Sequence, residues 1–134
     1  SRFDDVERWF AVLSGNGVRL AINGAAQTHT CASTPVVFDG AALVECQLVD
    51  GPTLDFNLMV RQGRGRMERV HGDVAQAVSS GSAVALWSGA AQAQATFEGQ
   101  TIELPPQTLA WRHLDMGGRV HVSAPDGLWI EIAS

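Results

Sequence analysis

The chain has 134 residues, of which 46% are hydrophobic and 17% are charged. This composition fits one folded domain with a buried core and excludes a disordered tail. The net charge is −5 and all nine basic residues are Arg, which argues against a nucleic-acid partner and, without Lys, excludes a P-loop. No apolar run approaches the roughly 20 residues of a membrane span, so no membrane partner is expected. A reducing, cytoplasmic location is predicted from the two cysteines, which are interpreted below as reduced thiols.

Turn signals follow one another at short intervals along the whole chain. Between them lie short runs rich in Val, Leu, Ile, Phe and Trp, and residues 19–24 and 119–125 alternate polar with apolar side chains. Many short strands joined by Gly-rich turns are typical of an all-β sandwich or barrel. The turn signals are Gly15-Asn16-Gly17, Asn23-Gly24, Asp39-Gly40, Asp50-Gly51-Pro52, Gly63, Gly72-Asp73, Ser79-Ser80-Gly81, Ser88-Gly89, Glu98-Gly99, Pro105-Pro106, Gly117-Gly118 and Asp126-Gly127.

No segment keeps the 3.6-residue apolar period of a helix over a useful length. Residues 72–83 are the only helix-friendly stretch, and Ser79-Ser80-Gly81 ends it early. The order of strands and turns in residues 9–30 is repeated in residues 84–111, although the two segments share few residues. A repeat of this kind indicates a small barrel that has been duplicated.

The segment 50–63 has polar residues inside a strand-like run that follows the turn at Asp50-Gly51-Pro52. In a strand, successive side chains point to opposite faces. We expect Phe56 to lie in the core, with Asp55 and Asn57 facing either solvent or the mouth of a cavity; alternatively, Asp55 braces the turn as a hydrogen-bond acceptor. The two faces are Leu54, Phe56, Leu58 and Val60 against Asp55, Asn57, Met59 and Arg61.

Three segments, "VLSGNGVRLAING", "VVFDG" and "LVDGPTLDFNLMVRQGR", resemble the HutD/Ves family. The Gly-Pro turn followed by Asp-Phe-Asn and a basic segment is the most specific signature, and the resemblance covers nearly the whole chain. It implies an all-β, cupin-type double barrel (a bicupin) in which about residues 1–70 form the first half and about residues 71–134 the second. Family members carry a further segment in front, so this bicupin is expected to be N-terminally incomplete.

The resemblance also bears on metal binding, because ordinary cupins hold a metal with three His and one Glu. Laid on this chain, those positions fall on Ser1, Phe3, Arg8 and Leu43, and an Asn position falls on Gln47. None of these side chains is a metal ligand, and the Arg8 guanidinium would repel a cation. No metal or other cofactor is therefore expected.

The same correspondence predicts that Leu43, Glu45 and Gln47 point into the first barrel together with Arg8. A buried charge needs a partner, so either Arg8 and Glu45 form an ion pair or a small anion binds Arg8. The candidate ligand-binding residues are Arg8, Glu45, Gln47, Asp55, Asn57 and Arg61.

Other chemistry-bearing residues are expected to be structural. The cluster Arg61, Arg64, Arg66 and Arg69 is interpreted as a solvated strand and turn. Cys31 and Cys46 have neither metal-site nor redox spacing, and their apolar surroundings predict buried, reduced thiols.

No residue pattern in the chain indicates catalysis. There is no GxSxG elbow, and the Tyr acid of metal-free cupin epimerases is missing. An acid/base pair of Glu45 and Asp55 stays open. An enzyme is therefore not the favoured interpretation.

The resemblance implies a role in controlling histidine utilisation, through binding of a small carboxylate such as urocanate or formylglutamate. Arg8 would hold the carboxylate and the polar residues would read the other end. Two alternatives are an enzyme acting on a similar small acid and a structural stress protein without a ligand. A second copy of the chain, forming a homodimer, is an open alternative as a partner.

Overall fold

The structure, a computed structural model, describes residues 3–133. Every regular element in this part of the chain is a β-strand, which confirms the predicted all-β class. None of these residues forms a helix that could cross a membrane. The chain divides into two compact units, Ser1–Gly65 and Arg66–Ser134.

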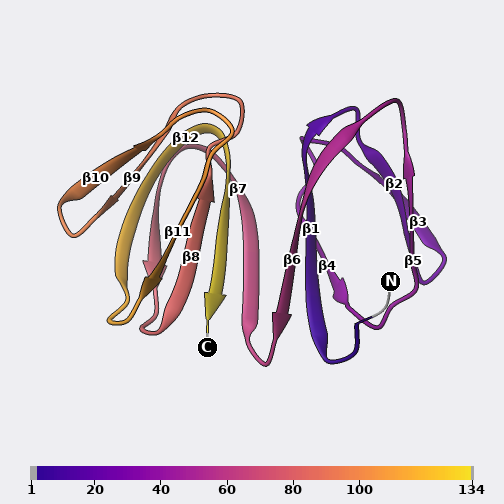
Figure 1. The fold of residues 1–134 in the computed structure, drawn as a ribbon, viewed down its shortest axis with the longest axis horizontal. Helices are drawn as coiled ribbons and strands as arrows, with labels where there is room; N and C mark the ends of the chain where they lie inside the picture. Colours follow the sequence, from indigo (N-terminus) through magenta and orange to yellow (C-terminus); the bar gives the residue numbers. More distant parts are fainter. Residues whose placement is uncertain (1–2, 134) are drawn as a thin grey trace. The chain divides into compact units, whose positions relative to one another are not determined.

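The first unit contains two three-stranded antiparallel sheets (Figure 1). In one sheet β1 lies between β4 and β6, and in the other β2 lies between β3 and β5. Because β1 and β2 follow each other in the chain, the tight turn between them carries the backbone from one sheet to the other. The strands are β1 (Val6–Gly15), β2 (Val18–Ile22), β3 (Ala25–His29), β4 (Val36–Asp39), β5 (Val44–Leu48) and β6 (Thr53–Arg61).

The second unit is built on one six-stranded sheet with the order β10-β9-β12-β8-β11, to which β7 is added by pairing with β12. The strands β10 and β11 therefore lie at the two ends of this order. The strands are β7 (Arg64–Val78), β8 (Ser82–Trp87), β9 (Ala93–Phe97), β10 (Gln100–Leu104), β11 (Leu109–Leu114) and β12 (Gly118–Ala133).

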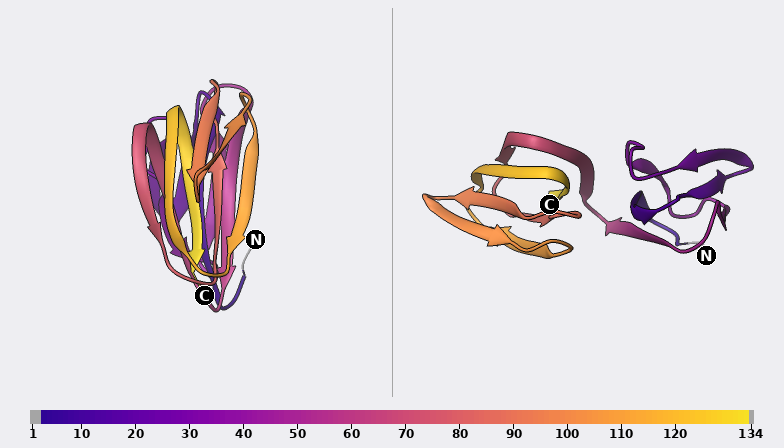
Figure 2. Two further views of the ribbon diagram at one scale, coloured as in Figure 1. Left: turned by 90° about the vertical axis from the view of Figure 1, so that its left-hand side faces the viewer. Right: turned by 90° about the horizontal axis from the view of Figure 1, so that it is seen from above.

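The long strand β12 pairs with two different strands of this sheet. Its first part, Val120–Ser123, pairs with β9, and its last part, Leu128–Ile132, pairs with β8. Figures 1 and 2 show β7 and β12 arching, so that each passes from one layer of the second unit to the other. In the first unit the same two pairings are made by separate strands, β5 with β2 and β6 with β1. The strands β8 and β9 thus correspond to β1 and β2, which is what a duplicated fold requires.

Each unit has its own hydrophobic core, formed where the alternating apolar residues of its strands face inward. One buried cluster of the first unit contains Phe10, Val12, Val18 and Leu20. The corresponding cluster of the second unit contains Val70, Val78, Val84, Leu86, Ala93, Leu104, Leu114, Val120, Val122, Ala124 and Trp129.

The helix-friendly stretch 72–83 is not helical in the structure. Its first part continues β7 up to Val78, which agrees with the finding that no segment of the sequence has a convincing helical period. Gln76 and Val78 are buried while Ala75 and Ala77 are exposed, a period of two. Pairing with β12 and burial of alternate side chains therefore outweigh the local helix preference of Ala and Gln.

Two corresponding glycines lie where two backbone segments of a unit approach each other closely. Gly15 (φ 94°) and Gly89 (φ 81°) each follow a Ser at the end of β1 and β8. A Cβ on Gly15 would lie 2.5 Å from the carbonyl oxygen of Pro52, and one on Gly89 would overlap the carbonyl oxygen of Asp126. Only glycine fits these two positions, because the backbone conformation and the close approach both exclude a side chain.

We expect Gly89→Ala to destabilise the protein by at least about 3 kcal/mol, because strain and a backbone clash add together. The matched control is Gly99→Ala, since Gly99 has φ 75° but open space around it. Strain alone should cost the control about 1–2 kcal/mol. Urea unfolding of both variants checks this, and equal losses would contradict the close approach.

Candidate functional site

The strand pair β1 and β6 places polar residues next to the core of the first unit. Asp55 lies opposite Val12, and Asn57 lies opposite Phe10. Because directly paired residues point to the same side of a sheet, Asp55 and Asn57 share the side that carries Phe10 and Val12, called here the inner face. The predicted alternation of residues 54–61 therefore holds, and its polar set faces inward.

Arg8 lies on the same inner face, two residues before Phe10. It is paired with Phe38 of β4 on one side and with Met59 of β6 on the other. Its guanidinium carbon lies 5.0 Å from the ring centroid of Phe38 and 5.6 Å from that of Phe3. Both distances are within the range of cation–π attraction, so two aromatic rings hold the cation in position.

A short hydrogen-bonded series joins Arg8 to Asp55. Arg8 Nη2 donates to Asn57 Oδ1 at 3.2 Å, and Asn57 Nδ2 donates to Asp55 Oδ1 at 3.1 Å. Both ends of the Asn57 amide are thus engaged with protein. Asn57 acts as a bridge that fixes the spacing between a cation and a carboxylate.

Arg8 has no carboxylate partner among residues 3–133, and its Nε is buried without any hydrogen-bond partner. The ion pair with Glu45, one of the two arrangements considered from the sequence, is not present. A buried N–H donor without an acceptor is costly, at about 1–3 kcal/mol. The site therefore has an unsatisfied donor and an uncompensated positive charge at the same side chain.

The surroundings of Asp55 shift its protonation. Partial burial raises the pKa of the Asp55 carboxyl, while the hydrogen bond from Asn57 opposes that shift. Partial burial and the nearby Asp55 carboxylate together raise the pKa of the Cys46 thiol. The raised pKa favours the neutral thiol form of Cys46.

The predicted inward placement of Leu43, Glu45 and Gln47 is wrong. Glu45 lies opposite Ala21 and Gln47 opposite Arg19, while Val44 packs on the core. Leu43, Glu45 and Gln47 are all exposed. A strand that is shifted by one residue exchanges its two faces, so Glu45 and Gln47 point away from the inner face.

Three further sequence-based expectations for the first unit need adjustment. Phe56 is only half-buried and Leu54 is exposed, so Leu58 and Val60 are the buried members of the apolar face. Arg61 is exposed at the end of β6, and its side chain has no hydrogen bond or ion pair within residues 3–133. Cys46 is exposed and Cys31 half-buried, rather than both being buried, although both are free thiols.

His29 borders the inner face and was not predicted from the sequence as part of it. It is buried, and its ring packs edge-on against Phe10 at 6.3 Å between centroids. Burial lowers the pKa of His29, which favours the neutral imidazole. His29 lies opposite the core residue Val18 in the β2–β3 pair. Knowledge of this strand register would therefore have predicted that His29 faces the core.

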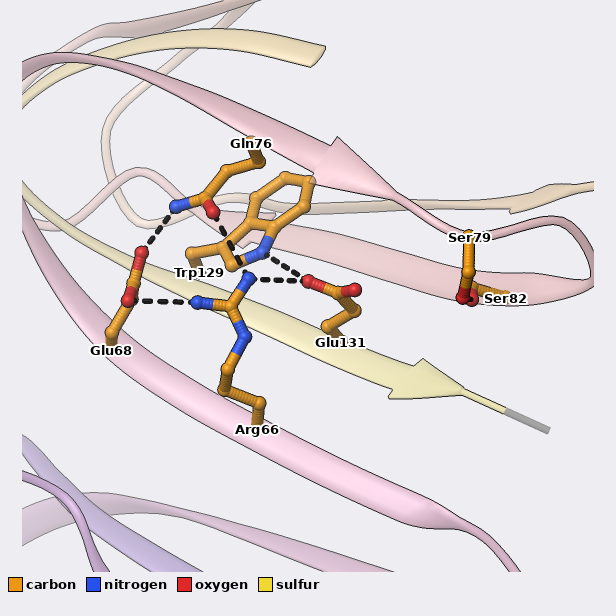
Figure 3. Close-up of polar contacts among 7 residues, drawn as sticks. All are labelled: Arg66, Glu68, Gln76, Ser79, Ser82, Trp129 and Glu131. Carbon is orange, nitrogen blue, oxygen red and sulfur yellow. Dashed lines mark hydrogen bonds and ion pairs between the residues drawn. The ribbon is translucent and has the colours of Figure 1, made fainter. Parts of the chain in front are cut away.

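The second unit holds a polar cluster that the sequence analysis did not identify (Figure 3). Arg66 Nη1 lies 2.9 Å from Glu68 Oε2, and Arg66 Nη2 lies 2.5 Å from Glu131 Oε2. Gln76 accepts a hydrogen bond from Arg66 and donates one to Glu68. Arg66 is therefore neutralised within the protein, unlike Arg8, and the interpretation of the basic cluster as merely solvated is wrong at this residue.

Potential metal ligands do not cluster in the described part of the chain. Residues 3–133 contain no group of three His, Cys, Asp or Glu side chains placed to hold an ion. Of the positions that correspond to cupin ligands, Arg8 and Phe3 form the stacked arrangement, Leu43 is exposed, and Ser1 lies outside the described residues. The chemistry available at the inner face is thus hydrogen bonding and charge recognition.

Replacing Asp55 by Asn should change how stability depends on pH. A raised carboxyl pKa means that the folded state binds the proton more tightly than the unfolded state does. The stability that protonation of Asp55 contributes is therefore fully present below the pKa of the unfolded state, and it is lost as the pH rises through the pKa of the folded state. We therefore expect Asp55→Asn to have a higher melting temperature than the wild type at pH 7. The difference should shrink towards pH 3.5 or so, below the ordinary Asp pKa of about 3.9.

Thermal melts of both proteins between acidic and neutral pH measure this difference. Asp39→Asn, at an exposed carboxylate in β4 of the same unit, is the control. A wild type that is more stable than Asp55→Asn at pH 7 would show that the Asp55 carboxylate is stabilised by its surroundings.

Glu131→Ala tests the cluster of the second unit. Trp129 Nε1 donates to Glu131 Oε2 at 3.1 Å, and Trp129 is 1% exposed. Truncation leaves this buried donor without a partner and should cost about 1–3 kcal/mol in urea unfolding. The control Glu103→Ala removes an exposed hydrogen bond to Gln92 and should stay within about 0.5 kcal/mol of the wild type. Similar effects of the two variants would show that the cluster contributes no stability.

Comparisons with known proteins place this geometry in a family. Residues 1–130 match the family model HutD. The chain is 28% identical over 105 residues to an uncharacterised 21.2 kDa protein of Pseudomonas putida named for the region 3′ of hutC. That match covers 77% of this chain and 55% of the relative, so the chain spans about half the length of the curated relative.

Solved structures show the same fold. HutD from Pseudomonas fluorescens superposes with a TM-score of 0.83 at 23% identity, covering 99% of this chain and 71% of that one. A conserved protein of unknown function from Pseudomonas aeruginosa gives a TM-score of 0.77 at 25% identity, covering 98% and 72%. The likeness to these and other solved structures confirms the all-β, cupin-type fold. Since the family model matches residues 1–130, the chain belongs to the HutD family.

Proposed function

We propose that the chain binds a small carboxylate of histidine catabolism, with urocanate and formylglutamate as the two ligands to test, and thereby modulates histidine utilisation. The observation that carries the proposal is Arg8, whose charge has no carboxylate partner and whose buried Nε has no acceptor among residues 3–133. A ligand carboxylate would satisfy both deficits, and an Arg–carboxylate contact is a strong, charge-assisted hydrogen bond.

The rest of the inner face fits the other end of such a ligand. Both acids carry, besides a carboxylate, an N–H group in an imidazole or an amide. Asp55 is held by Asn57 at a fixed place relative to Arg8 and has a free oxygen to accept that N–H. In this arrangement Asn57 positions both charged groups and Arg61 lies at the rim. Glu45 and Gln47 have no part in it, because they are on the opposite face.

The link to histidine utilisation comes from the family and from its relative beside hutC. A binding role is favoured over catalysis by the chemistry of the inner face. Cys46 is kept neutral and His29 is packed against Phe10, so neither is poised to react. Asp55 also lacks the acid/base partner considered from the sequence, because Glu45 is on the opposite face. These observations support recognition of charge as the role of the inner face.

Isothermal titration of the protein with each acid at pH 7 tests the proposal. Arg8→Gln should weaken binding about 10- to 100-fold, because a hydrogen bond to a charged group contributes a binding free energy of that size. Arg19→Gln is the matched control, because Arg19 is exposed on the outer side of β2 in the same unit. Equal affinities of the two variants, or no binding of either acid to the wild type, would contradict the proposal.

The same samples separate binding from catalysis. Chromatography after prolonged incubation should return each acid unchanged at the concentration supplied. Formation of a product that depends on protein concentration would favour the enzyme alternative.

A further inference from the structure

A cavity of about 210 Å³ lies inside the second unit, separate from the inner face of the first unit. It is bounded by β8, β9, β10, β11 and β12, all within Arg66–Ser134. Trp129, Phe97 and Leu86 form much of its apolar wall. Arg112 and Gln100 are the charged and polar side chains of its lining, and the lining contains no carboxylate.

Small residues on the inner side of the strands create this space. Ala95 of β9 lies opposite Ile102, and Ala110 of β11 lies opposite Leu86. In the corresponding strand of the first unit, Leu20 occupies the place of Ala95 and belongs to the core. The second unit thus replaces a core-filling leucine by alanine, and the missing volume is part of the cavity.

The strand order explains why the cavity is open. The strands β10 and β11 are the two ends of the sheet order, and each pairs on one side only, with β9 and β8. Gln100 is on the first and Arg112 on the second, and both are exposed. A molecule that enters between these strands meets polar groups at the opening and aromatic groups inside.

Arg112 supplies an uncompensated charge at this opening. It is paired with Val84, a residue of the core cluster, so its side chain is on the cavity side of β11. Within residues 3–133 it makes no ion pair and no hydrogen bond through its side chain. An anion bound there would gain a charge-assisted contact without displacing a partner of Arg112.

We propose that this cavity is a second binding site, which takes a small aromatic carboxylate with its ring against Trp129 and Phe97 and its carboxylate on Arg112. The volume suits one ring, since an apolar cavity of about 150 Å³ is enough to bind benzene. Aromatic walls favour a ring by offset or edge-to-face contact. The site does not include Arg8, so this proposal can be tested independently of the function proposed for the first unit.

Benzoate is the probe, with benzamide as its neutral analogue of similar shape. Titration of the whole chain with benzoate at pH 7 should saturate, and benzamide should bind at least about tenfold more weakly because it lacks the charge. Arg112→Gln should weaken the binding of benzoate by about tenfold or more and leave the affinity for benzamide nearly unchanged. Arg119→Gln, at an exposed Arg of β12 outside the cavity lining, should bind benzoate like the wild type.

A second variant tests the cavity itself. Ala95→Leu restores the leucine of the first unit and should abolish benzoate binding by filling the space, with folding checked by circular dichroism. If that variant does not fold, the decision rests on Arg112→Gln, whose exposed position makes it tolerable. Arg8→Gln should keep full benzoate affinity.

Three results would overturn the proposal. They are the absence of saturation up to about 10 mM benzoate, equal affinities of the wild type and Arg112→Gln, and loss of benzoate binding in Arg8→Gln. The last would assign benzoate to the first unit and leave the function proposed there intact.

Discussion

The antiparallel register of β1 and β6 is the constraint on which the inner face depends. It sets Asp55 opposite Val12 and Asn57 opposite Phe10, and the strand period then places Arg8 beside them. The pairing shifts only between Val12 and Ser14, beyond the polar residues, where β1 approaches its closing turn. A slip of one residue would exchange the faces and leave Arg8 apart from Asn57, so the same contacts that build the core also build the site.

The arrangement carries a cost that packing alone does not explain. Within the described part of the chain, Arg8 keeps a buried donor without an acceptor, and Asp55 is partly buried without a cationic partner. The second unit solves a similar problem differently, since Arg66 is met by two carboxylates and an amide. Uncompensated polar groups at the inner face and a satisfied cluster around Arg66 are what is expected if a ligand binds the inner face and none binds that cluster.

The sequence carries most of the information on fold class and on the β1–β6 face, because both follow from the period of two. The alternation across residues 54–61 is long and regular, and its polar set was placed on one face correctly. In β5 the apolar residues Val44, Cys46 and Leu48 alternate with Glu45 and Gln47, and this alternation agrees with the observed faces, whereas the correspondence with cupin metal motifs predicts the opposite face for Glu45 and Gln47.

Other features could not be obtained from local patterns. Arg66 meets Glu131, which is 65 residues away in the chain, so the ion pair depends on the pairing of β7 with β12. The helix preference of residues 72–78 yields to the same pairing. The spacings Arg66-x-Glu68 and Trp129-x-Glu131 do put the paired side chains on one strand face, and they are local signs of the cluster.

A crystal structure of the chain grown with formylglutamate tests the central claim most directly. The account predicts a ligand carboxylate on the Arg8 guanidinium beside Phe38, within hydrogen-bond distance of Nε, and the ligand amide N–H directed to Asp55. Well-defined ligand density elsewhere, with Arg8 still bound only to Asn57, would contradict it.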